Sequence, residues 1–131
     1  MRVRAIAAMD PIAQDIVVSG HDRDSAGLLV FPNVAACRRL AGLDETAPLT
    51  DVLAHDAVRA HLRQGLARLK SEGGGSSRYA TRARLLDHPP LVDAGEITDK
   101  GYVNQAATAS RRAHLVERLY QDPAPEDVIV V

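Results

Sequence analysis

Apolar positions near the start of the chain fall into one helical and two extended segments. Residues 2–8 predict the end of a helix, because a proline follows at position 11 and the residue before a proline is disfavoured in helical backbone. Two runs rich in branched apolar residues, 12–19 and 26–31, are separated by a polar cluster at 20–25. This pattern predicts an antiparallel hairpin. The second run is apolar throughout, which indicates a strand that is central in its sheet or covered on both faces.

The pattern then changes to helical spacing. Asn33 is a predicted N-cap, and Gly42 is the predicted end of the helix that follows it. Residues 50–71 place apolar side chains at helical intervals, which predicts an amphipathic helix with a second cap at Asp56. Its polar face is basic, and we interpret that face as solvated surface. The glycine-rich segment 73–77 lacks the lysine of a phosphate-binding P-loop, so we interpret it as a connection.

Polar and apolar residues alternate at 78–86, which predicts a third strand. The last amphipathic segment, 103–120, predicts a closing helix. Residues 122–131 include two prolines near their start, and we expect this tail to be loosely held. Together the elements predict an α+β fold in which a small, mostly antiparallel sheet of about three strands packs with helices. The fold is expected to form a single domain over residues 1–131.

The composition is that of an ordinary globular domain. The chain has 131 residues, of which 46% are hydrophobic and 25% charged, with a formal net charge of -1. These values exclude a disordered chain and a membrane-spanning one, and no membrane partner is expected. The apolar start is too short for a secretory signal, and the single cysteine, Cys37, excludes an internal disulfide. We therefore expect a cytoplasmic protein.

Several classes of function find little support in the residue types. The chain has no Trp, one Phe and three Tyr, which leaves little aromatic surface for stacking bases, so no nucleic-acid partner is expected. Five histidines are scattered without metal-ligand spacing, so no metal site is predicted. Ser19, His21 and Asp22 are close in sequence, but sequence neighbours rarely form a catalytic triad, and no nucleophile-elbow motif is present.

The segment 93–105 differs from the rest of the chain. It is charged and punctuated by glycine, and it lies between a predicted strand and a predicted helix, where functional residues concentrate. The only lysines are Lys70, on the polar helix face, and Lys100, in this segment. A lysine there can act as a point charge on a developing carboxylate or phosphate. The alternative is an ordinary solvated lysine.

The residues of this segment, DAGEITDKGYVNQ, followed by SRRAHLVERLY, resemble the end of feruloyl-CoA synthases. These enzymes belong to the adenylate-forming superfamily of acyl-CoA synthetases. The resemblance extends over most of the chain, through IVVSGHDRDSAGLLVFPN, LAHDAVRAHLRQGLARL and GGGSSRYATRARLL. It implies that the chain is the small C-terminal domain of mixed sheet and helices that serves as a lid. A large N-terminal adenylation domain, with the ATP and acid pockets, would lie upstream, together with the beginning of the first helix.

The resemblance also implies a role for Lys100. In the family, ATP and a carboxylic acid form an acyl-adenylate with release of pyrophosphate, and the CoA thiol then displaces AMP. A lysine near the end of the lid bridges the acid carboxylate and the nucleotide in the first half-reaction, and Lys100 resembles it. An ungapped alignment on Glu96-Ile97-Thr98 instead places Tyr102 at that position, because the wider superfamily has Gly before Lys.

The second half-reaction turns another face of the lid towards the active site. By resemblance, the hairpin turn with Gly20, His21 and Asp22 is a candidate part of the CoA site. The intact enzyme would use ATP and Mg²⁺, with CoA as co-substrate and an aryl or other carboxylic acid as substrate. None of these is expected to bind the isolated chain tightly, and the chain alone is expected to have no ligase activity. The alternative is a stand-alone, non-enzymatic module that binds a partner protein or a CoA-type ligand.

Overall fold

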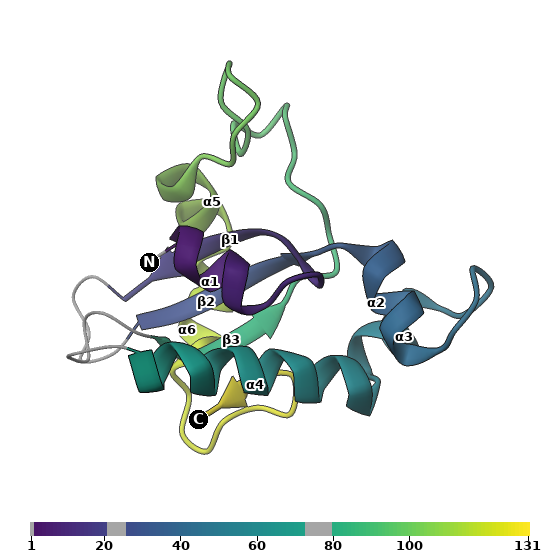
Figure 1. The fold of residues 1–131 in the computed structure, drawn as a ribbon. Helices are drawn as coiled ribbons and strands as arrows, with labels where there is room; N and C mark the ends of the chain where they lie inside the picture. Colours follow the sequence, from purple (N-terminus) through teal and green to yellow (C-terminus); the bar gives the residue numbers. More distant parts are fainter. Residues whose placement is uncertain (1, 21–25, 73–79) are drawn as a thin grey trace.

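The computed structural model describes residues 2–20, 26–72 and 80–131. In chain order the elements are α1 (Arg2–Ala8), β1 (Ala13–Ser19), β2 (Ala26–Pro32), α2 (Val34–Ala41), α3 (Leu49–Ala54), α4 (Asp56–Glu72), β3 (Ala80–Leu85), α5 (Gln105–Arg111), α6 (Ala113–Leu119) and β4 (Ile129–Val130), shown in Figure 1.

The strands form one four-stranded sheet in the order β1-β2-β3-β4. β1 pairs with β2 and β3 pairs with β4 in the antiparallel sense, whereas β2 and β3 are parallel. The parallel pair follows from the connection, since α2, α3 and α4 lie between β2 and β3 in the chain and carry it back across the sheet. The predicted α+β fold with a small, mostly antiparallel sheet is confirmed, with β4 as a further strand.

Helices cover both faces of the sheet. Leu28 and Val30 of β2 belong to one buried cluster with residues of α1 and α4. Leu29 and Phe31 point the opposite way and belong to a second cluster with Leu119 of α6. Figure 1 shows α1 and α6 on opposite sides of the sheet, and α4 packs beside α1 and against β3 on the first face. The uninterrupted apolar run predicted a strand that is central or covered on both faces, and β2 is both.

Local signals account for several helix ends. The Asn33 side chain accepts a hydrogen bond from the Ala36 N–H at the start of α2, and Gly42 ends that helix at φ 70°, in the left-handed region that glycine tolerates. The break between α3 and α4 falls where a second cap was predicted. The capping side chain is His55 rather than Asp56, since His55 Nδ1 accepts a hydrogen bond from the Ala57 N–H.

The first helix packs against the longest one at Gly65 of α4. A Cβ atom at this position would lie 2.7 Å from Cγ of Met9 and 3.1 Å from the Ala8 carbonyl oxygen. Met9 is fully buried. Glycine at position 65 therefore permits the close approach of the two segments.

The predicted closing helix is two helices. Val103 pairs with Ile97 in an isolated β-bridge, so the helix begins later, with Asn104 as N-cap accepting from the Ala107 N–H. Arg112 then separates α5 from α6, with φ −105° and ψ 31°.

The end of the C-terminal tail packs against the domain, whereas the sequence predicted a loosely held tail. Ile129 pairs with Ala83 of β3, and the Val128 and Ile129 side chains are buried. Asp127 forms ion pairs with Arg84 of β3 and Arg118 of α6. Buried apolar surface and these ion pairs hold the segment in the domain. No helix of the described part of the chain is long and apolar enough to cross a bilayer.

Candidate functional site

Lys100 lies in the turn of a short hairpin between β3 and α5. The Thr98 N–H donates to the Tyr102 carbonyl oxygen over 2.7 Å, and the Gly101 N–H donates to the Thr98 carbonyl oxygen over 2.9 Å. Gly101 has φ 86°, which a residue with a side chain rarely adopts. The turn therefore has a defined backbone path, and it leaves the Lys100 side chain exposed.

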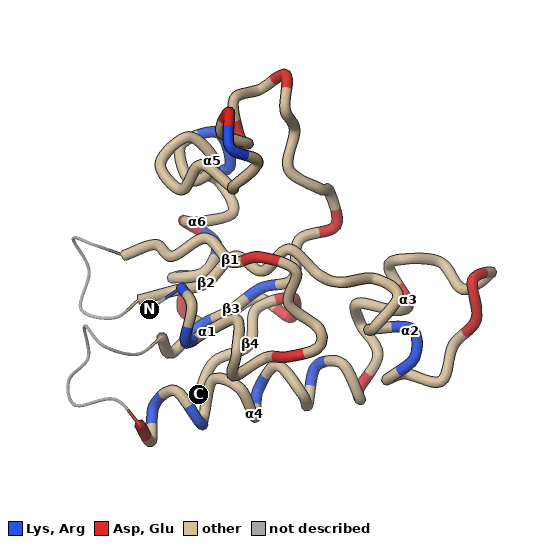
Figure 2. The backbone as a smooth tube through the Cα atoms, turned by 45° about the horizontal axis from the view of Figure 1, so that its top comes forward, with Lys and Arg blue, Asp and Glu red and all other residues tan. Residues whose placement is uncertain are grey.

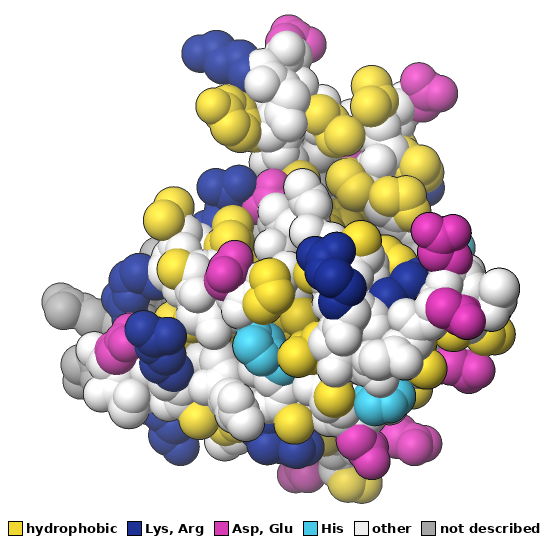
Figure 3. All heavy atoms as spheres, turned by 45° about the vertical axis from the view of Figure 1, so that its right-hand side comes forward, with side chains coloured by type: hydrophobic (Ala, Val, Ile, Leu, Met, Phe, Trp, Pro, Cys, Tyr) yellow, Lys and Arg dark blue, Asp and Glu magenta, His cyan; other side chains and the backbone are white. Residues whose placement is uncertain are grey.

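The segment that carries Lys100, residues 86–104 between β3 and α5, projects from the body of the molecule. Figure 1 shows the chain between β3 and α5 rising away from the sheet, and Figure 3 shows hydrophobic side chains on the projection. Leu91, Val92 and Tyr102 are 42%, 67% and 63% exposed. Several exposed apolar side chains on one projecting segment are consistent with a surface that contacts another molecule.

Glu96 and Arg112 form a buried ion pair at the base of this projection. The Arg112 Nε donates to Glu96 Oε2 over 2.8 Å, and an Arg112 terminal nitrogen donates to Glu96 Oε1 over 3.0 Å. The Glu96 side chain is 0% exposed and that of Arg112 is 6% exposed. Glu96 Oε1 also accepts from the Leu91 N–H over 2.8 Å. Both oxygens of the buried carboxylate are thus satisfied.

Arg112 also contacts the beginning of the projecting segment and the sheet. Its two terminal nitrogens donate to the carbonyl oxygens of His88 and Pro89, each over 3.0 Å. Its guanidinium carbon lies 5.0 Å from the centroid of the Phe31 ring in β2. One side chain therefore connects the central strand, the start of the segment and the residue that precedes the Lys100 hairpin.

The electrostatics keep Glu96 ionised. Hydrogen bonds from Arg112 lower the pKa of the Glu96 carboxyl below its ordinary value of 4.5, and the Leu91 N–H and the charges of Arg112 and Arg111 act in the same direction. Burial acts the other way, because it disfavours the charged form. The net direction is downward, so the pair is ionic at neutral pH.

Gln105 attaches the far end of the segment to the edge strand of the sheet. Its Oε1 accepts from the Val18 N–H over 3.0 Å, and its Nε2 donates to the Ile16 carbonyl oxygen over 2.9 Å. The side chain thereby takes the place of a neighbouring strand along β1. The start of α5 is fixed against the sheet.

Of the residues predicted for the CoA site, the structure describes Gly20 alone. Gly20 directly follows β1 and has φ 95°, a conformation that favours glycine. His21 and Asp22 lie outside the described residues. Gly20 and Lys100 therefore lie on separate segments of the chain. Lys70 is exposed on α4, a helix with several basic positions along its backbone (Figure 2).

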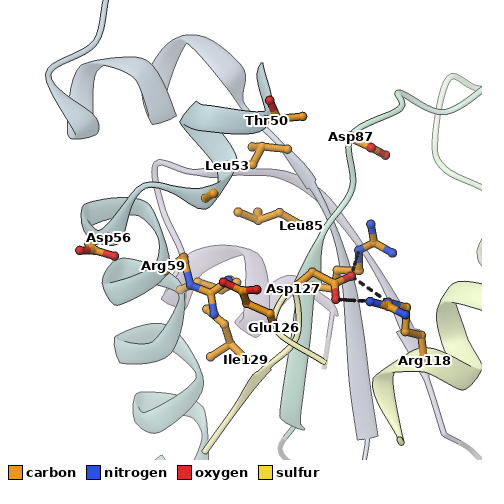
Figure 4. A pocket seen from close by; sticks show the side chains of 13 residues that line it. Thr50, Leu53, Asp56, Arg59, Leu85, Asp87, Arg118, Glu126, Asp127 and Ile129 are labelled. Carbon is orange, nitrogen blue, oxygen red and sulfur yellow. Dashed lines mark hydrogen bonds and ion pairs between the residues drawn. The ribbon is translucent and has the colours of Figure 1, made fainter. Parts of the chain in front are cut away.

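A cavity of about 590 Å³ lies elsewhere, where α3, α4, β3 and the C-terminal segment meet (Figure 4). Figure 4 shows Asp127 in the middle of this region, with ion pairs to Arg84 at 3.1 Å and Arg118 at 2.9 Å. These pairs hold the C-terminal segment. Among residues 2–20, 26–72 and 80–131, no group of three potential metal ligands lies together.

Sequence reasoning missed the Glu96–Arg112 pair. The residues are 16 positions apart, and Arg112 lies within a predicted helix where its partner could not be inferred from spacing. The available signal was weak: a carboxylate in a glycine-punctuated loop, and two consecutive arginines in an amphipathic helix.

No protein-family model and no curated protein sequence matches the chain. Solved structures do match. The chain superposes on the A domain of a carboxylic acid reductase from Segniliparus rugosus, solved in complex with AMP and a co-purified carboxylic acid, with a TM-score of 0.64 and 21% identity. The match covers 92% of this chain and 18% of that one.

Two further matches are of the same kind. The A-PCP didomain of carboxylic acid reductase from Segniliparus rugosus, in complex with AMP, matches with a TM-score of 0.62 and 20% identity over 90% of this chain and 15% of that one. The adenylation domain of a carboxylate reductase from Mycobacterium chelonae matches with a TM-score of 0.63 and 20% identity over 88% of this chain and 17% of that one. These neighbours are adenylation domains of adenylate-forming enzymes, and the chain spans less than a fifth of each. At such identities the likeness establishes the fold.

Proposed function

We propose that the chain is the C-terminal lid domain of an ATP-dependent acid–CoA ligase similar to feruloyl-CoA synthases. The observation that carries the proposal is the position of Lys100, exposed in the turn of a hairpin that is anchored at its base by a buried ion pair. The likeness in fold to part of the adenylation domains supports it. An aryl or other carboxylic acid would be the substrate.

In the first half-reaction, an oxygen of the acid carboxylate attacks the α-phosphorus of ATP. An acyl–oxygen–phosphorus bond forms, and the bond from the α-phosphorus to pyrophosphate breaks. Lys100 would lie between the carboxylate and the nucleotide, where its ammonium group offsets the repulsion between two anions. ATP, Mg²⁺ and the acid would be held by the large domain, with Mg²⁺ offsetting phosphate charge.

In the second half-reaction, the CoA thiol loses its proton to water, a bond forms between its sulfur and the acyl carbon, and the bond from the acyl carbon to the AMP oxygen breaks. The lid would then present the hairpin turn after β1, with Gly20, His21 and Asp22 as proposed contacts of CoA. Lys100 would take no part in this step. The first half-reaction would therefore depend on the Lys100 hairpin, and the second on the turn after β1.

The experiment compares the isolated chain with a fusion of the chain to a large adenylation domain. The purified 131-residue chain is incubated with ATP, CoA and a panel of aryl and aliphatic acids, and AMP formation is measured; we expect none above background. The chain is then fused to the large domain of a feruloyl-CoA synthase from which the native lid has been removed. The fusion should restore acid-dependent AMP formation. Turnover by the chain alone, or a fusion no more active than the lidless domain, would contradict the proposal.

The exposed apolar side chains of the projecting segment also favour a second function. Leu91, Val92 and Tyr102 would suit a stand-alone module that binds a partner protein without catalysis. The fusion experiment distinguishes the two functions, because a binding module would not restore adenylate formation. A CoA-type ligand for such a module is tested by titrating CoA into the chain.

A further inference from the structure

We propose that Glu96 and Arg112 are positioning residues for Lys100, an inference that rests on the function proposed above for Lys100. The pair would hold the Lys100 hairpin in the one orientation that adenylate formation needs. Neither residue would touch a substrate.

The covalent path from the ion pair to the lysine is short and well ordered. Glu96 immediately precedes Ile97, which bridges to Val103, and Lys100 lies in the turn that this bridge closes. The backbone of Glu96 also takes part, since its carbonyl oxygen accepts from the Asn104 N–H over 2.8 Å. Fixing Glu96 therefore fixes both strands of the hairpin at their base.

Arg112 supplies the rigid support. It lies between α5 and α6, and its guanidinium contacts the Phe31 ring of the central strand. The same group binds the Glu96 carboxylate and the carbonyl oxygens of His88 and Pro89. The planar guanidinium makes these contacts at once, which an ammonium group cannot do.

The exposure of the projecting segment makes such support necessary. Leu91 and Val92 are exposed, so apolar packing contributes little to the orientation of this part of the segment. Catalysis by a point charge depends on its distance from the reacting anions, and a misplacement of about 1 Å can cost about a hundredfold in rate. A polar anchor at the base can supply the orientation that packing does not.

Two variants and one control test the inference. Arg112→Lys keeps the positive charge but removes the planar guanidinium group that makes several contacts at once. Glu96→Gln keeps the shape of the side chain but removes its negative charge. Arg118→Lys is the matched control, because Arg118 forms a comparable two-nitrogen contact with Asp127 without contacting the hairpin.

The first measurement is amide hydrogen exchange on the 131-residue chain. We expect the Thr98 and Asn104 amides to lose at least about tenfold in protection in both variants, and the amides of β2 to lose no more protection than the change in the free energy of global unfolding accounts for. The control should leave the hairpin amides unchanged. Unchanged protection of Thr98 and Asn104 in both variants would overturn the inference.

The second measurement uses the fusion to the large domain. In both variants we expect kcat for adenylate formation to fall at least about tenfold with little change in KM for ATP, while thioester formation from preformed acyl-adenylate is retained. Equal loss of both half-reactions would indicate a merely structural role and overturn the inference. If the wild-type fusion forms no adenylate, the proposed function fails, and so does the role assigned to the pair, whatever the exchange data show about the hairpin.

Discussion

The Nε atom of Arg112 lies 2.8 Å from Oε2 of Glu96, and the carboxylate is entirely shielded from solvent. The contact joins the point where α5 meets α6 to the base of the Lys100 hairpin. Because a buried charge is costly unless it is paired, the ion pair restricts the segment between the two residues, 97–111, to one arrangement. The contact has consequences for stability as well as for the proposed function.

Arg112→Ala should destabilise the domain by about 3–5 kcal/mol, because it leaves the buried Glu96 carboxylate with only the half-exposed Arg111, at 3.7 Å, as a charged partner. Urea unfolding of the 131-residue chain measures the change. Arg118→Ala is the matched control: its side chain is 43% exposed, so loss of its ion pair with Asp127 should cost about 1 kcal/mol or less. Equal effects of the two substitutions would contradict the burial argument.

The Glu96 ion pair should make stability depend on pH. Folding lowers the pKa of the Glu96 carboxyl. The stability that the ionised carboxylate contributes is therefore fully present above the ordinary pKa of 4.5 and is lost as pH falls through the folded-state pKa. The difference in free energy of unfolding between wild type and Glu96→Gln should therefore shrink as pH falls below 4.5. Other shifted carboxyls, such as Asp127, are present in both proteins and cancel. A difference that stays constant down to pH 3 would contradict the assignment.

Gly65→Ala should destabilise the domain by about 1–3 kcal/mol, even though alanine favours helix by about 1 kcal/mol. The added Cβ would lie 2.7 Å from Cγ of Met9, which is buried and has little room to move. Gln64→Ala, at an exposed position of the same helix, is the control and should be neutral or stabilising. Thermal melting of both variants provides the comparison. A more stable Gly65→Ala protein would show that α1 can shift away from α4.

Cys37 should be unreactive in the folded chain. Burial raises the pKa of its thiol to about 11, and the thiolate is the nucleophile. Compared with a thiol of pKa 9.0, the thiolate fraction at pH 8 is about a hundredfold lower, and lack of access slows the reaction further. The rate with an aromatic disulfide reagent should rise at least about a hundredfold when urea is added. Similar rates with and without urea would contradict the burial of Cys37.

Local sequence determined much of the fold. The unbroken apolar run predicted β2 as a strand covered on both faces, and Asn33 and Gly42 predicted both ends of α2, because capping depends on neighbouring backbone groups. The parallel pairing of β2 with β3 and the addition of β4 could not be predicted in this way. These pairings depend on contacts between distant residues such as Ala83 and Ile129.

The candidate site could likewise be predicted only in part from the sequence. Lys100 could be singled out because lysines are scarce and because the segment around it lies between a strand and a helix. Its anchor could not, because Arg112 reads as a polar position in an amphipathic helix until the fold brings it to Glu96. A residue that acts through tertiary contacts leaves no periodic signal in the sequence.

The most direct test of the account compares Lys100→Ala with Lys70→Ala in the fusion to the large domain. Acid-dependent exchange of pyrophosphate into ATP reports adenylate formation, and thioester formation from preformed acyl-adenylate reports the second half-reaction. We predict that Lys100→Ala lowers the exchange at least about a hundredfold and leaves thioester formation within about twofold, while Lys70→Ala changes neither. Full exchange activity in Lys100→Ala, with its loss in Tyr102→Phe instead, would contradict the assignment of Lys100.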